Sequence, residues 1–233
     1  MRPAPRTCAL LLAAALTGAC TTLVDRRVET AIERELPRLI GPAARYEVSV
    51  AGADPDAGYL QRLRIAGQRV LRERAPALDR LDLDLREVRV DRERKQVTSL
   101  EHATARVRVL PQDVAAHLQR QGWFDDVSVA FTAPNGVVID GRPTLGGIRL
   151  PAAATVEARG RLVARRSQLR IELDDLRAAG FSVPGLLRGA IQLAINPVLD
   201  AGTFPVPARF ETVSHDGEAL VVTASASQAP DAY

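Results

Sequence analysis

The sequence predicts an α+β fold in which antiparallel strands enclose helices and an apolar interior. Two patterns predict it. After residue 80, apolar and polar residues alternate along several segments, which is the period of strands with one wet and one dry face. Residues 181–202, in contrast, form a helical segment with few polar positions. A helix this apolar must be covered on most sides, and the one-faced strands can cover it.

The N-terminus resembles a lipoprotein export signal. Arg2 and Arg6 precede an uncharged apolar run, Cys8 to Ala15, which is too short to span a bilayer. The next residues, "LTGAC", resemble a bacterial lipobox with its leucine one place early. We therefore expect a lipoprotein signal peptide over residues 1–19 and a lipid-modified Cys20. The alternative is an ordinary signal peptide cut near Ala19, which leaves Cys20 as a free thiol.

This signal predicts where the protein works. Cys8 leaves with the signal, so Cys20 is the lone cysteine of the exported chain and cannot form an intramolecular disulfide. Thr21 stands where an aspartate would favour the inner membrane, so we expect the periplasmic face of the outer membrane. Without Arg2 and Arg6 the formal charge falls from +3 to about +1, and we expect no nucleic-acid partner. Roughly 210 residues remain, most economically as a single domain over residues 20–225.

The exported chain begins with a predicted helix. In "TTLVDRRVETAIERELPRLI" one apolar stripe recurs at helical spacing, with charged residues away from it. Thr22 and Asp25 resemble a capping box, and Pro37 should bend or end the helix. The stripe consists of Val24, Val28, Ile32, Leu36 and Leu39.

Strands and one short helix follow. "RLDLDLREVRV" alternates and then slips by one residue, which predicts a strand with a bulge that helps to curve a sheet. "ATARVRVL" predicts a second strand, and "PQDVAAHLQRQG" a helix closed by Gly122. Three hairpins are expected around Asn135-Gly136, Arg165–Ser167 and Asp216-Gly217. Residues 226–233 are expected to form a disordered tail.

Together these segments resemble the LmeA-like family of phospholipid-binding envelope proteins. The resemblance rests on the amphipathic helix after an export signal, on "LREVRVD", and on the late block from "IELDDLRAAGFSVPGLLRGAIQLAINPVLDAG" to "EALVVTAS". It implies a strongly curved antiparallel β-sheet wrapped around long helices, with an apolar interior that binds phospholipid. The expected partners are therefore phospholipid acyl chains, and the membrane through the lipid anchor.

An acyl chain needs a groove lined by aliphatic carbon. The candidate lining residues belong to the two apolar helices, although a role as plain core is the competing interpretation for each. A cluster of arginines, Arg69, Arg72 and Arg74, could meet lipid phosphates or could be an ordinary solvated face. The candidate lining residues are Val28, Ile32, Leu186, Leu187, Ile191 and Ile195.

The sequence offers little for catalysis. His102, His117 and His215 stand apart, without the spacing of a metal site, and no nucleophile elbow or phosphate-binding glycine loop occurs. The adjacent pairs Asp125-Asp126 and Asp174-Asp175 point to opposite faces of a strand and make poor acid–base couples. We therefore expect no enzyme, metal or cofactor. Two hypotheses remain: a lipid-binding and possibly lipid-shuttling lipoprotein, and a structural lipoprotein with a filled core that docks an envelope enzyme or complex.

Overall fold

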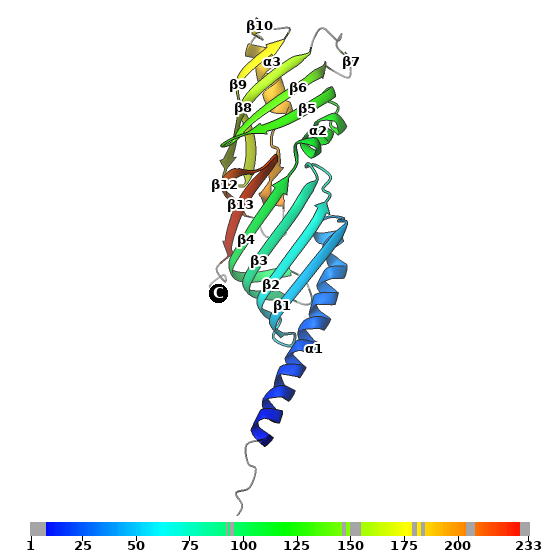
Figure 1. The fold of residues 1–233 in the computed structure, drawn as a ribbon, viewed down its shortest axis with the longest axis vertical. Coiled ribbons are helices and arrows are strands. Elements are labelled where there is room, and N and C mark those ends of the chain that lie inside the picture. The colour runs from blue at the N-terminus through cyan, green and yellow to red at the C-terminus, as the bar shows by residue number, and fades with distance from the viewer. Residues whose placement is uncertain are drawn as a thin grey trace, which may run out of the picture.

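The computed structural model describes residues 8–228, apart from 92, 94–95, 146–147, 150–154, 179–180, 183–184 and 204–207. Within these residues, two antiparallel sheets lie end to end along the long axis of the molecule (Figure 1). Three α-helices accompany them: α1 (Cys8–Leu39), α2 (Pro111–Arg120) and α3 (Gly185–Ala194).

The first sheet has six strands in the order β1-β2-β3-β4-β13-β12 and is curled into a half-barrel (Figure 1). Helix α1 lies against β1 at one edge. At the other edge, β12 reaches the second sheet, where the amide of Phe210 donates to the carbonyl of Arg166 over 2.8 Å. The strands are β1 (Arg45–Asp54), β2 (Tyr59–Val70), β3 (Leu78–Asp91), β4 (Gln96–Val109), β12 (Arg209–Asp216) and β13 (Ala219–Gln228).

The faces of this sheet follow the alternation in the sequence. Leu63, Leu85 and Ala103 stand side by side on β2, β3 and β4 and share the inner, apolar face. One residue along each strand, Arg64, Asp84 and Thr104 form a matching row on the outer, polar face. The expected division into one wet and one dry face is confirmed.

The second sheet runs β10-β9-β8-β6-β5, with β11 paired to β9 and β7 paired to β6. Helix α2 packs on β5, and α3 contacts β9. The strands are β5 (Phe124–Thr132), β6 (Gly136–Leu145), β7 (Ile148–Arg149), β8 (Val156–Arg165), β9 (Gln168–Ala178), β10 (Phe181–Ser182) and β11 (Leu199–Asp200); a single 3₁₀ turn, η2 (Ala201–Thr203), follows β11.

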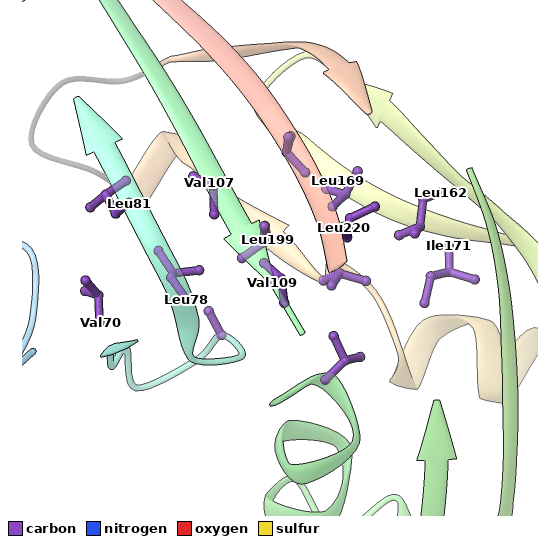
Figure 2. Packing of buried hydrophobic residues seen from close by; sticks show 14 of the residues in the cluster. Val70, Leu78, Leu81, Val107, Val109, Leu162, Leu169, Ile171, Leu199 and Leu220 are labelled. Atoms are coloured by element: carbon purple, nitrogen blue, oxygen red, sulfur yellow. The ribbon is translucent and has the colours of Figure 1, made fainter. Parts of the chain in front are cut away.

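One hydrophobic core joins the two sheets. Figure 2 shows Val109 and Leu220 of the first sheet and Leu199 and Leu169 of the second converging where the sheets meet. Val109, Leu169 and Leu220 are 0 % exposed, so no solvent separates the two halves at this point. Tight packing of this kind makes the molecule one body.

Several predicted elements are confirmed. The slip in the first strand falls between the buried residues Leu85 and Val88 of β3, where Glu87 has a φ of 52°. A separate register shift between β3 and β4 follows after Arg89, with the additional residue in β4. The short helix is α2, followed by Gly122 at a φ of +73°. The three hairpins are β5–β6, β8–β9 and β12–β13.

The expectation of long helices wrapped by the sheet is wrong. Both α2 and α3 have ten residues, and α3 ends before Asn196-Pro197, where the chain turns to form β11. Leu193 on α3 is 74 % exposed, so the strands do not cover this helix on most sides. Helix α1 is longer, with 32 residues, but it lies along the edge strand β1 rather than inside the half-barrel (Figure 1).

Two details at the ends of the chain also differ from expectation. The helix does not begin at a Thr22–Asp25 capping box, because α1 is continuous from Cys8 to Leu39; it does end soon after Pro37. The expected tail starts too early, because β13 continues to Gln228, where it still pairs with Leu100 of β4. Residues 229–233 lie outside the described part of the chain.

Candidate functional site

The inner face of the first sheet carries an apolar groove of about 260 Å³. Side chains of β2, β3, β4 and β13 form its floor. Ile32 and Leu36 of α1 lie on the side of β1, and Phe210 of β12 lies on the opposite side. Of the described residues that line the groove, Thr104 is the only polar one, and it belongs to the row whose side chains lie on the outer face of the sheet. Such a surface can hold hydrocarbon but offers almost no hydrogen bonds to a polar ligand.

The groove exists because none of the described helices and strands fills the hollow of the half-barrel. Leu83, Ala103 and Ala105 stand in the centre of the floor, yet each remains partly exposed. In a sheet covered by a long helix, residues at these positions would be buried. An apolar floor left partly open is a place for an apolar ligand.

Helix α1 is held at the groove by three carboxylates. Glu33 accepts a hydrogen bond from the amide of Val48 (3.3 Å), Glu29 from Val50 (2.9 Å) and Asp25 from Ala53 (2.9 Å). These amides belong to β1, whose outer edge pairs with no other strand among the described residues. The carboxylates therefore satisfy backbone donors that an edge strand leaves open.

The C-terminal end of α1 is fixed as well. The hydroxyl of Tyr46 donates to the carbonyl of Gly41 over 2.7 Å, and Arg72 donates to the carbonyl of Ile40 over 3.0 Å. Burial raises the pKa of Tyr46 and lowers the pKa of Arg72. Both groups keep their protons at neutral pH and remain donors, so Ile40 stays at the end of the groove.

The arginine cluster considered for lipid phosphates has protein partners instead. Arg69 binds both carboxylate oxygens of Asp113, at 2.6 and 2.7 Å, and Asp113 is a buried residue of α2. Arg72 holds the end of α1, and Arg74 is exposed. Two of the three guanidinium groups thus join parts of this chain.

Two larger hollows, of about 820 and 590 Å³, have charged linings. Their charges are largely matched within the sheet: Arg62 pairs with Asp84, and Arg108 with Asp79. The hydrogen bond from Arg62 lowers the pKa of Asp84. These hollows have larger volumes, but their charged linings do not suit an acyl chain. Because the arginines in these pairs already have carboxylate partners, these hollows do not suit an anionic ligand either.

The structure distributes the six candidate lining residues over different surroundings. Ile32 lines the groove, and Val28 packs against the core one turn earlier. Ile191 and Ile195 are 6 % and 3 % exposed in the core beside β9 and are not among the groove residues that the structure describes. This placement matches the competing interpretation as core. Leu186 and Leu187 lie on α3 and Cys20 on α1, but their side chains are outside the described part of the structure.

Sequence reasoning missed most of the groove floor. Ala103 and Ala105 of β4 and Ala224 and Ala226 of β13 line it together with leucines of β2 and β3. Alternate alanines in "HATARV" and "VVTASA" were a usable signal, because small residues at alternate positions leave space on one face of a strand. Only the register shows that the two sets of alanines are neighbours.

Among the described residues, the carboxylates and histidines singled out in the sequence lie apart from one another or pair with other groups of the chain. The described residues contain no group of three or more His, Cys, Asp or Glu that could hold a metal ion. Asp125 and Asp126 both pair with Arg142, and His215 packs edge-on against the ring of Phe131 at 5.8 Å. In the same part of the chain, no helix has the length and apolar character needed to cross a membrane.

A curled antiparallel sheet with a dry, open inner face offers a surface suited to an elongated apolar ligand. A family model of LmeA-like phospholipid-binding proteins matches residues 19–225, nearly the whole chain. The protein belongs to this phospholipid-binding family, which confirms the resemblance seen in the sequence. Comparisons with curated proteins and with solved structures give no match.

Proposed function

We propose that this protein is a non-catalytic envelope lipoprotein that binds a phospholipid by one acyl chain in the groove and exchanges it with the membrane that holds its anchor. The observation that supports this most is the lining, which is apolar except for Thr104 among the residues that the structure describes. A volume of about 260 Å³ is slightly below the ~300–1,000 Å³ of typical small-molecule sites. It suits one hydrocarbon chain, with the second chain and the head group outside.

The proposed anchor puts the groove close to a membrane. Cys20 and Ile32 are both on α1, twelve residues apart, which corresponds to about 18 Å along a helix. A lipid on Cys20 would keep the groove within that range of the periplasmic face of the outer membrane. Reach of this kind supports exchange of a lipid with the same membrane.

The test is lipid analysis of protein purified from native membranes. Ala105→Phe fills the groove, whereas Arg106→Phe adds the same ring to the outer face of the same strand. We expect phospholipid to co-purify with the wild type and with Arg106→Phe and to be lost from Ala105→Phe, with similar melting temperatures. A wild type that never carries phospholipid would favour the docking lipoprotein instead.

Transfer is tested separately from binding. Fluorescent phospholipid in donor vesicles should reach acceptor vesicles faster with wild-type protein than with Ala105→Phe. Binding without faster transfer would leave a lipid-holding protein that is not a carrier.

A further inference from the structure

We propose that the groove measures the length of the acyl chain. Its floor is made of small residues, Ala103, Ala105, Ala224 and Ala226, and it ends at Val107 and Val222. This inference rests on the proposed function and adds a specificity to it: a linear chain is accepted up to a fixed depth.

The argument begins with the pairing of β4 and β13. Ala103 stands opposite Ala226, Ala105 opposite Ala224, and Val107 opposite Val222. Because side chains alternate along a strand, all three pairs point to the inner face. They form successive rows along the groove, and side-chain volume increases from the alanine rows to the valine row.

Exposure changes at the same place. Ala103, Ala105 and Ala226 are partly exposed on the floor, whereas Ala224, opposite Ala105, is 4 % exposed. In the next row, Val107 is 5 % exposed and Val222 is 0 % exposed. On β4 the open floor therefore ends where alanine gives way to valine, and on β13 it ends one row earlier, at Ala224.

Beyond the valines, no residue of β4 or β13 in the described part of the chain lines the groove. The following row, Val109 opposite Leu220, is 0 % exposed and meets Leu169 of the second sheet (Figure 2). A chain end that reaches Val107 therefore meets packed core, and further methylenes would have to remain outside.

The row spacing converts into chain length. Two residues of a strand advance about 6.8 Å. A fully extended hydrocarbon chain advances about 1.3 Å per carbon, from a C–C bond of about 1.5 Å. One row therefore corresponds to about five methylenes.

The experiment uses lysophosphatidylglycerols that differ only in acyl chain length. For the wild type, affinity should rise by up to about fourfold per added methylene while the chain is buried, and then stop rising at one length. Val107→Ala/Val222→Ala extends the alanine floor by a row and should move that length up by about five carbons. Ala105→Val/Ala224→Val should move it down.

The control is Arg106→Ala/Thr223→Ala, the pair between the two altered rows on the outer face. It should keep the wild-type cutoff. Val107→Ala/Val222→Ala removes core volume and can lower stability. Ala105→Val/Ala224→Val removes none, so it tests independently whether the cutoff in chain length moves down. If both groove variants kept the wild-type cutoff in chain length, the proposed measurement of length would be overturned. If the wild type bound no lysophosphatidylglycerol of the series, the proposed function itself would be overturned.

Discussion

Glu29 of α1 accepts a hydrogen bond from the amide of Val50 in β1, over 2.9 Å. It is the middle contact of three, between Glu33 with Val48 and Asp25 with Ala53. Four helical residues rise about 6.0 Å and two strand residues about 6.8 Å, so carboxylates spaced by four match alternate amides of the strand. Ala53 comes three residues after Val50, and between them Gly52, at a φ of +65°, interrupts the regular alternation of the strand.

Glu29→Ala should therefore destabilise the protein. It removes a charged acceptor from a partly buried backbone amide, which costs about 1.5–3 kcal/mol. Denaturant unfolding measures the loss, and amide hydrogen exchange should show faster exchange at Val50. Arg27→Ala, two residues away and exposed, is the control and should change stability little. Equal effects of the two variants would show that the contact does not hold α1.

Leu173 and Glu172 test the faces of β9. Leu173 is 6 % exposed, whereas Glu172 points outward and pairs with Arg165. Leu173→Asp buries a carboxylate without a partner and should cost more than about 4 kcal/mol, enough to unfold the protein. Glu172→Gln loses a surface ion pair worth about 1 kcal/mol or less. Thermal unfolding compares them, and similar shifts would contradict the assignment of faces.

The parts of the fold that could be predicted from the sequence are those set by neighbouring residues. Alternation in "QLRIEL" assigns Leu169 and Ile171 to the inner face, and both are buried. Turn residues such as Asn135-Gly136 locate the hairpins. In each case the physical cause lies within a few residues of the element.

The groove could not be predicted in this way, because it depends on register and curl. Ala105 and Ala224 are 119 positions apart in the chain and become neighbours only through the pairing of β4 with β13. The sequence predicts lining residues on the apolar helix α3 because hydrophobicity alone does not distinguish side chains packed in the core from side chains that line a groove. Asn196 lies two residues after this helix, and its side chain donates to the carbonyl of Gln192 in the last turn.

The side chain of Asn196 takes the place of a missing strand beside β9. Its oxygen accepts from the amide of Ile171 over 2.6 Å, and its nitrogen donates to the carbonyls of Ile171 (2.9 Å) and Gln192 (2.7 Å). Asn196→Ala leaves these groups unpaired and should cost about 2–4 kcal/mol in unfolding free energy. Asn196→Asp keeps the acceptor but not the donor, so it should fall between wild type and Asn196→Ala. An unchanged stability in Asn196→Ala would show that water replaces the amide.

His117 should make stability depend on pH. Burial on α2 lowers the pKa of His117, and Arg120 lowers it further. The unfolded chain then binds a proton more readily than the folded one, so stability is fully present above about pH 6.5 and falls as the pH drops toward the folded pKa. Melting temperatures from about pH 7.5 to about pH 5 should show this fall in the wild type, and a smaller one in His117→Leu. Parallel pH profiles would assign the fall to the carboxylates instead.

Cys20→Ser tests the anchor on which the proposed location depends. A lipid chain contributes about 0.8 kcal/mol per buried CH₂, so two or three chains hold a protein on a membrane essentially permanently. Without the thiol, the protein should appear in the soluble periplasmic fraction or remain unprocessed, and mass spectrometry should find no diacylglycerol on its N-terminus. Cys8→Ser is the matched control, because residue 8 lies in the expected signal peptide. Membrane partition of Cys20→Ser equal to that of the wild type would exclude lipidation at Cys20. The groove would then reach its membrane by another attachment, and the lipid analysis of Ala105→Phe would still decide what it binds.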